Sequence, residues 1–285
     1  MKTTKPPSIG ERFCGWAILH GPIKAVIQIG SRVRPSSDLS AADDHSDWDY
    51  QVVVADPVLF EDRAAFESAV GSTAHAFVVR SGTLGMVRKL TALFSDGMID
   101  VVILPAREVL AVREAVRSGQ SSQSPIAARA LLSMSSVLLG GYKMLKGEEE
   151  FGELYRFTST QVPPPRISDR EACALAEGFV CDYVAARRLI ARGEFAAGQR
   201  WLHVHLAETN FRLLHELRLR RSHPSYPDAR RLALGETDSW SGRVTIDGGA
   251  SRGALTRSLD AAAGALRELM RALVGTKWQW PQAAR

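Results

Sequence analysis

Residues 27–54 read IQIGSRVRPSSDLSAADDHSDWDYQVVV and hold two apolar runs separated by a polar loop. The first run ends at Gly30-Ser31, and the second run, residues 50–54, directly follows Asp47-Trp48-Asp49. Aromatic and β-branched residues favour extended chain. The stretch therefore predicts two strands, with Gly-Ser at the end of the first and an aspartate pair at the start of the second.

Asp47 and Asp49 are two residues apart at the start of the second strand. Side chains two apart on a strand point to the same side, so this spacing pairs the two carboxylates and turns Trp48 away, where core packing is its favoured role. Adjacent carboxylates repel unless a cation lies between them, and hard oxygen ligands suit Mg²⁺. The pattern favours a magnesium site over an acidic surface pair.

Gly30 and Ser31 are predicted to contact phosphate. A glycine at a strand end lets the backbone approach a ligand closely, and a serine can cap a short helix whose N–H groups point outward. An ordinary turn is the alternative. Arg32 adds a positive charge that suits a phosphate, although an exposed arginine explains it almost equally well.

Asp100 supplies a third carboxylate at the start of another strand-like run, residues 99–104. Residues 87–94 precede it across Ser95-Asp96-Gly97, a turn signal, and the two runs predict a hairpin. If the later strand lies beside the strand of Asp49, three carboxylates converge. Asp100 is therefore predicted as a third metal ligand, with strand-end capping as the alternative. A further role as general base is left open.

The order of these motifs resembles the nucleotidyltransferase fold of the DNA polymerase beta superfamily. Within it, Gly30-Ser31-Arg32 together with residues 46–50, SDWDY, is most similar to the aminoglycoside and lincosamide nucleotidyltransferases. The resemblance covers residues 25–105, and beyond them only the layout is shared, a helical second domain. The long acidic loop between the two motifs departs from the family pattern.

This resemblance implies Mg²⁺-dependent transfer of a nucleoside monophosphate, AMP from ATP, to a hydroxyl of a small molecule such as an aminoglycoside-like antibiotic. Asp47 and Asp49 would hold two magnesium ions, with Asp100 on the ion nearer the acceptor. The Gly30-Ser31-Arg32 turn would contact the triphosphate. The acceptor would bind between the two domains, where ligands are common.

A chain of 285 residues can form two modest domains. Residues 118–124, SGQSSQS, form the best linker candidate. We therefore predict an α+β protein: a nucleotidyltransferase domain over residues 1–118, with a mixed β-sheet and helices on one side, and an all-α helical-bundle domain over residues 119–285. Residues 1–115 carry 12 Lys and Arg against 14 Asp and Glu, whereas the remainder carries 24 against 17.

Apolar periodicity and turn residues predict the other elements. Helices are expected over residues 8–20, 57–70 and 105–117, and a strand over 74–80. After the linker the pattern is almost wholly helical, with helices expected over 125–146, 168–191, 195–221 and 254–274. Ser168 and Glu171 have capping-box spacing at the start of the second of these. Long antiparallel helices predict a small bundle.

Cys14, Cys173 and Cys181 are too few and too scattered for a zinc cluster or a disulfide framework. They fit a reducing, cytoplasmic environment. The N-terminus has no apolar leader core, and no apolar stretch is long enough to span a membrane. We therefore expect a cytoplasmic protein without a membrane partner.

Other chemically capable residues have a simpler interpretation as solvated or structural groups. Arg88 or Lys89 could contact a nucleotide, and a carboxylate of the helical domain could orient or deprotonate the acceptor. The remaining candidates could bind a metal ion. For each of these residues, a solvated or structural side chain is the favoured interpretation. These helical-domain carboxylates and metal candidates are Glu177, Asp182, Glu208 and Glu216, and Asp43, Asp44, His45, His203, His205 and His215.

Two other classes of function remain open from the sequence. One is an inactive member of the same fold that binds nucleotide and regulates a partner, although the presence of all three carboxylates counts against it. The other is a basic nucleic-acid-binding protein, which is disfavoured because aromatic and basic residues are not interleaved and no reading helix is recognisable.

Overall fold

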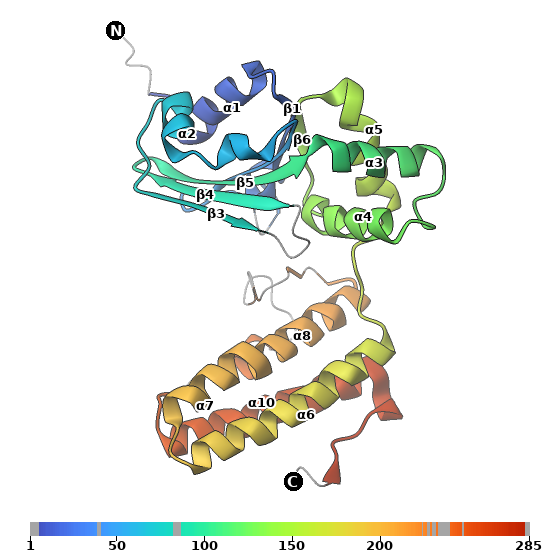
Figure 1. Cartoon of the computed structure of the whole chain (residues 1–285). Helices are drawn as coiled ribbons and strands as arrows, with labels where there is room; N and C mark the ends of the chain where they lie inside the picture. Colours follow the sequence, from blue (N-terminus) through green and yellow to red (C-terminus); the bar gives the residue numbers. More distant parts are fainter. Residues whose placement is uncertain are drawn as a thin grey trace. The chain divides into compact units, whose positions relative to one another are not determined.

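The computed structural model describes residues 6–38, 41–81, 87–223, 225–226, 229, 232, 240–246 and 248–282 (Figure 1). The chain forms two compact units, Met1–Pro165 and Arg166–Arg285. The boundary expected at residue 118 therefore falls inside the first unit, because the segment after the linker packs onto the sheet. The second, all-α unit begins at residue 166, 47 residues after the expected start at residue 119.

The first unit combines a mixed sheet with helices, which confirms the α+β class. Its helices are α1 (Ile9–Leu19), α2 (Arg63–Val70), α3 (Ala106–Arg117), α4 (Pro125–Leu138) and α5 (Glu148–Gln161). Its strands are β1 (Ile23–Ile29), β2 (Trp48–Val54), β3 (Ala76–Ser81), β4 (Arg88–Phe94), β5 (Gly97–Pro105) and β6 (Lys143–Lys146). Short 3₁₀ turns, η1 (Gly30–Val33) and η2 (Pro57–Phe60), follow β1 and β2.

The strands lie in the order β3-β4-β5-β2-β1-β6. β2 and β5 pair in parallel, whereas the other neighbours are antiparallel. The expected β4–β5 hairpin is confirmed, with Phe94 opposite Gly97. β6 differs from expectation, because a helix was predicted to continue to residue 146. The chain leaves α4 at Gly140-Gly141, where Gly141 has a φ of +98° that favours glycine, and it then extends along β1.

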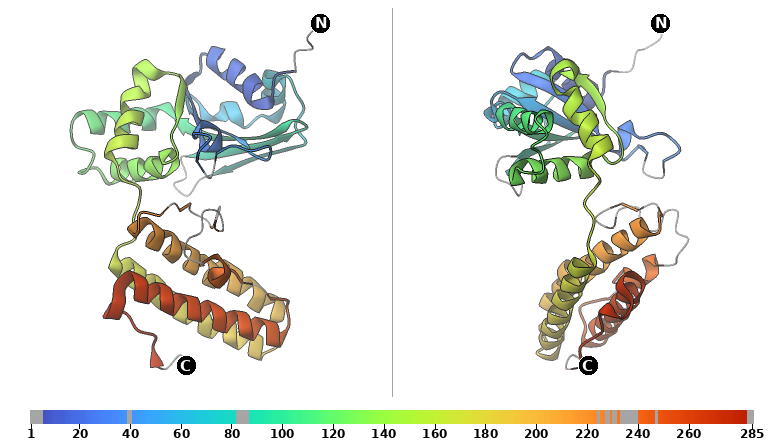
Figure 2. Two further views of the ribbon diagram at one scale, coloured as in Figure 1. Left: turned by 180° about the vertical axis from the view of Figure 1, so that it is seen from behind. Right: turned by 90° about the vertical axis from the view of Figure 1, so that its right-hand side faces the viewer.

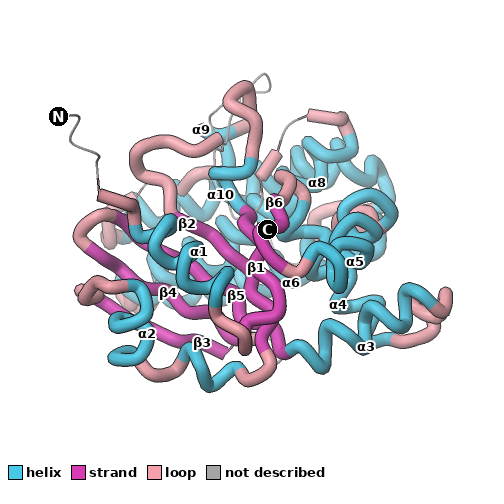
Figure 3. The backbone as a smooth tube through the Cα atoms, turned by 90° about the horizontal axis from the view of Figure 1, so that it is seen from above, coloured by secondary structure: helices cyan, strands magenta, loops and turns pink. Residues whose placement is uncertain are grey.

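Helices cover both faces of the sheet, rather than one face as the sequence suggested. On one face, α1 and α2 place Phe13 and Phe66 against Tyr50 and its neighbours, and Figure 3 shows these helices in front of the strands. On the other face, α3, α4 and α5 pack on β1 and β2 and lie side by side (Figure 2). Both faces are buried because β1 and β2 contain runs of consecutive apolar residues, whose side chains point alternately to the two faces of the sheet.

A buried hydrogen bond ties α5 to the centre of the sheet. The hydroxyl of Tyr155 donates to Oε1 of Gln51 over 2.9 Å. Burial raises the pKa of Tyr155 above its ordinary value, so the hydroxyl stays protonated and keeps its role as donor. Gln51, in the middle of β2, therefore has a buried partner from the segment that follows the predicted linker.

The second unit is helical and begins with α6. Its elements are α6 (Asp169–Ala191), α7 (Phe195–Trp201), the π-helical turn η3 (Leu202–Ala207), α8 (Glu208–Arg220), α9 (Ser241–Val244), α10 (Arg252–Val274) and η4 (Gly275–Lys277). The capping box predicted at Ser168 and Glu171 is present, with the Glu171 side chain accepting from the Ser168 N–H over 2.9 Å. Leucines and alanines of α6, α8 and α10 form the core.

Glu216 on α8 anchors the segment that leads into α6. It is 2% exposed and accepts hydrogen bonds from Arg166 at 2.9 Å, from Arg220 at 2.9 Å and from the Ile167 N–H at 3.0 Å. Burial disfavours the charged carboxylate, but these hydrogen bonds outweigh it, and the pKa of Glu216 lies below its ordinary value. Among the helical-domain carboxylates named above, Glu216 is therefore a structural group.

No helix in the described part of the chain is long and apolar enough to cross a membrane.

Replacing Glu216 by glutamine should lower the free energy of unfolding of the second unit by about 2 kcal/mol at pH 7, because a buried, charge-assisted cluster is lost. The native pKa is depressed, so this contribution is full above the unfolded pKa of about 4.3 and disappears as pH falls through the native pKa. Denaturant unfolding followed by circular dichroism at pH 7 and in acid measures it. Glu268→Gln, which breaks an exposed pair with Arg243, is the matched control and should change stability by less than about 0.5 kcal/mol. Equal losses in both variants would contradict this role for Glu216.

Candidate metal centre

The parallel pairing of β2 with β5 brings the predicted carboxylates together. In this register Asp49 lies opposite Asp100, and Trp48 lies opposite Ile99. Side chains of paired residues lie on the same face of a sheet. Asp47, two residues before Asp49, immediately precedes β2. The sequence prediction that the strand of Asp100 lies beside the strand of Asp49 is therefore confirmed.

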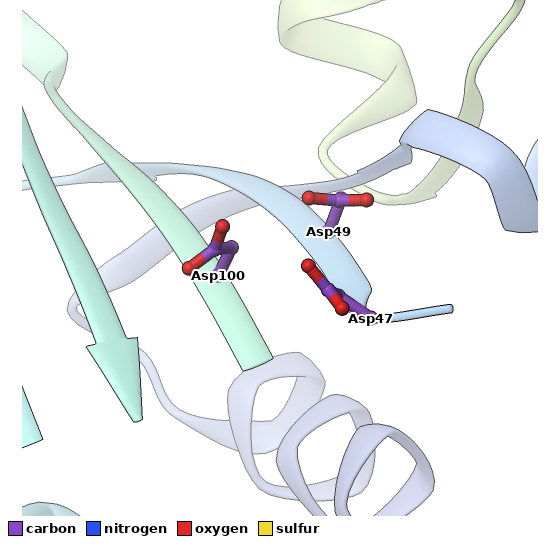
Figure 4. Close-up of side chains that lie close together, drawn as sticks. All are labelled: Asp47, Asp49 and Asp100. Atoms are coloured by element: carbon purple, nitrogen blue, oxygen red, sulfur yellow. The ribbon is translucent and has the colours of Figure 1, made fainter. Parts of the chain in front are cut away.

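Asp47, Asp49 and Asp100 converge in space. Each offers a carboxylate oxygen such that the three oxygens lie within 4.8 Å of one another. Figure 4 shows the three side chains on the same side of the two strands, pointing toward a shared space. Asp100 is buried, whereas Asp47 and Asp49 are partly exposed. Carboxylates this close repel, and the charged state of all three is favoured when a cation lies among them.

Trp48 faces the opposite side of the sheet, as predicted from the alternation. Its ring lies directly on Gly10 of α1, where a Cβ atom would be 2.0 Å from the Trp48 ring. Trp48 also packs against the core beneath α1 and α2. The tryptophan therefore anchors the start of β2, and with it the position of the flanking aspartates.

Gly30 is needed where η1 approaches the site. Its φ is +78°, a conformation that favours glycine, and a Cβ atom there would be 2.2 Å from Oδ2 of Asp49. Ser31 follows it in η1. The structure thus places the Gly-Ser turn beside Asp49, while the predicted contacts of Gly30 and Ser31 with phosphate stay predictions.

Arg32 holds the chain that enters β2. Its guanidinium donates to the backbone carbonyl oxygens of Asp47 at 2.8 Å and Ser46 at 2.5 Å, and it stacks 4.2 Å from the centre of the Trp48 ring. A planar guanidinium suits this combination of donation and stacking. The sequence suggested a phosphate contact for Arg32, which stays a prediction. Its role in fixing the Asp47 backbone was not foreseen.

Two residues of β4 contact Asp100, and sequence reasoning missed one of them. Thr91 donates from Oγ1 to Oδ1 of Asp100 over 2.6 Å, and Lys89 lies with Nζ 2.5 Å from Oδ2. The signal was present in the hairpin, because the turn at residues 95–96 places Thr91 opposite Asp100. For Lys89 the sequence favoured a solvated side chain, with a nucleotide contact as the alternative.

The other candidates are not brought to the three aspartates as a metal cluster. Within the described ranges, Asp47, Asp49 and Asp100 form the one group of three potential ligands close enough to hold an ion. Asp43 instead accepts from the Ser46 hydroxyl and the His45 N–H within its own loop, and Arg88 pairs with Glu61. The remaining residues lie on helices or loops: Asp44, Glu177, Asp182, His203, His205, Glu208 and His215.

The donor set suits a hard divalent cation. All three side chains offer carboxylate oxygens, which Mg²⁺ and Mn²⁺ prefer over nitrogen or sulfur. Asp47, Asp49 and Asp100 are therefore the residues that can hold a metal ion, with Gly30 leaving room beside Asp49. The match between this site and a divalent cation depends on the chemistry and spacing of the three carboxylates.

Comparison with known proteins gives structural neighbours but no sequence relatives. No protein-family model matches the chain, and no curated protein matches it. The chain is similar to the crystal structure of an aminoglycoside 6-adenyltransferase from Bacillus subtilis, with a TM-score of 0.40 and 13% identity over 98% of this chain and 95% of that chain.

A second similar structure is a nucleotidyltransferase-like protein from Exiguobacterium sibiricum, with a TM-score of 0.32 and 11% identity. The match covers 93% of this chain and 74% of that one.

Gly30→Ala should weaken Mn²⁺ binding at least roughly tenfold, because the added methyl group displaces Asp49. Isothermal titration calorimetry on the metal-free protein measures this. Gly71→Ala is the matched control, since Gly71 also has a positive φ, +64°, but a Cβ atom there meets nothing within 4 Å. The control should lose about 1 kcal/mol of stability and bind Mn²⁺ normally. Unchanged Mn²⁺ binding by Gly30→Ala would show that Asp49 does not depend on this close approach.

Proposed function

We propose that this protein is a Mg²⁺-dependent nucleotidyltransferase that moves a nucleoside monophosphate, AMP from ATP, onto a hydroxyl group of a small molecule. One observation carries the proposal: Asp47, Asp49 and Asp100 converge from adjacent parallel segments while Gly30 packs against Asp49. Sequence motifs that resemble the antibiotic-modifying nucleotidyltransferases supply the reaction class.

Asp47, Asp49 and Asp100 would hold two magnesium ions. Bound metal ions supply charge stabilisation for the attacking and leaving oxygens in an in-line displacement. The Gly30-Ser31 turn binds the triphosphate beside Asp49, and its N–H groups hold the departing pyrophosphate. Arg32 acts through Asp47, because its hydrogen bonds fix the backbone that presents this carboxylate. The products are the nucleotidylated acceptor and pyrophosphate.

A proton must leave the acceptor hydroxyl as its oxygen attacks the α-phosphorus. Asp100 is one candidate base, and a carboxylate of the helical unit is the other. Glu216 is removed from that second group by its hydrogen bonds with Arg166 and Arg220. The remaining helical candidates are Glu177, Asp182 and Glu208, and individual replacement by glutamine or asparagine distinguishes them from Asp100.

The charge of the chain bears on the acceptor. Residues 116–285 carry 24 Lys and Arg against 17 Asp and Glu, a balance that suits neutral or anionic compounds better than polycations. An aminoglycoside-like antibiotic is nevertheless the example that the motifs suggest. An acceptor screen should therefore pair aminoglycosides with uncharged and acidic hydroxyl compounds, and should compare ATP with the other nucleoside triphosphates.

Asp49→Asn should abolish pyrophosphate release from ATP and Mg²⁺ in the presence of an acceptor found by that screen. The same variant should be as stable as the wild type or more stable without metal, because one repelling charge is removed. Asp44→Asn, a change at an exposed loop residue, is the matched control and should retain full turnover. Full activity in Asp49→Asn would refute the metal assignment.

Mg²⁺ together with a non-hydrolysable ATP analogue should raise the melting temperature by a few degrees, because a ligand that binds the native state stabilises it. Differential scanning fluorimetry with and without each component measures the shift, and Asp49→Asn should lose it. A shift without turnover on any acceptor would favour the inactive, nucleotide-binding regulator. The absence of a shift at millimolar ligand would contradict nucleotide binding.

A further inference from the structure

Asp100 is contacted on both of its oxygens by neighbours from β4. Thr91 donates to Oδ1, and the Lys89 ammonium lies 2.5 Å from Oδ2. The side chain of Asp100 is 11% exposed, whereas that of Lys89 is 48% exposed. A largely buried carboxylate therefore meets an ammonium group that reaches it from the solvent side.

The hairpin register produces this arrangement. Thr91 lies opposite Asp100, and Lys89 lies opposite Val102, two residues further along β5. Residues two apart on a strand share a face, so Lys89, Thr91 and Asp100 lie on one side of the sheet. The contact follows from the main-chain pairing, and Lys89 needs only its flexible stem to reach Oδ2.

From this geometry we propose that Lys89 is a positioning residue that competes with a divalent cation for Asp100. In the metal-free protein its ammonium compensates one of the three negative charges. When an ion binds, the ammonium gives up Oδ2 and moves toward solvent, while Thr91 continues to orient Asp100 through Oδ1. The inference rests on the metal site in the proposed function, and its consequence is weak binding of a bare ion.

The exposure of Lys89 makes this exchange inexpensive. An ammonium on a four-carbon stem is readily rehydrated when it leaves a carboxylate, whereas a fully buried ion pair would leave an uncompensated charge. Arg80 provides a control for the charge of Lys89. It lies opposite Lys89 on β3, on the same face of the sheet but one strand further from Asp100. Arg80 carries the same charge without contacting the carboxylate.

The test measures Mn²⁺ binding to the full-length, metal-free protein by electron paramagnetic resonance, without nucleotide. Lys89→Met should bind Mn²⁺ about tenfold more tightly than the wild type, because the competing charge next to Asp100 is gone. Lys89→Arg, which keeps that charge, should stay within about twofold of the wild type. Arg80→Met should also stay within about twofold, because its charge is distant and screened.

A merely structural lysine predicts the opposite sign, since loss of a support for Asp100 would weaken Mn²⁺ binding. Unchanged or weaker binding by Lys89→Met, with a native circular dichroism spectrum, overturns the inference. Lys89→Gln serves as a second uncharged variant if the methionine variant does not fold. Asp49→Asn separates failure of the metal site from failure of the Lys89 inference. If this variant binds Mn²⁺ as the wild type does, the metal site itself is refuted. If it loses binding and Lys89→Met matches the wild type, only the role of Lys89 fails.

Discussion

Electrostatic repulsion between aspartates is the constraint around which this site is built. The parallel pairing of β2 and β5 sets Asp49 level with Asp100, and Asp47 comes within reach of both. Isolated carboxylates do not gather in this way without compensation. Two contacts of the first unit fix these side chains: the ring of Trp48 packs against Gly10 of α1, and Arg32 donates to the carbonyl oxygens that precede β2.

One face of the sheet is buried in the protein core, and the other carries the three aspartates. One face is buried under α1 and α2, which hold the strands through an aromatic core. The other face is covered by α3, α4 and α5 where it meets β1 and β2, while β3 and β4 keep exposed side chains such as Val78 and Leu93. The carboxylates belong to this second face, so the sheet can be rigid on one side and accessible to ligands on the other.

Much of the site was predictable because it depends on patterns between residues that are close in the sequence. The two-residue period pairs Asp47 with Asp49, and a strand-like run identifies Asp100. Contacts that form only when an irregular loop folds back were not predictable. The carbonyl partners of Arg32, for example, lie 14 and 15 residues away in the sequence. β6 was missed because four residues, KMLK, carry too short a pattern to separate from the helix before them. The predicted hairpin did contain the register that brings Lys89 to Asp100.

The late strand β6 has a consequence for dividing the protein. A truncation at the predicted linker would remove α4, β6 and α5, and would leave the edge of β1 that pairs with β6 without a neighbour. An unprotected edge strand rich in apolar residues is a template for self-association. Gln51 would also lose its buried donor from Tyr155. A fragment that keeps the whole compact unit therefore extends through residue 165, and the chain must be synthesised well past Asp100 before β6 can complete the sheet.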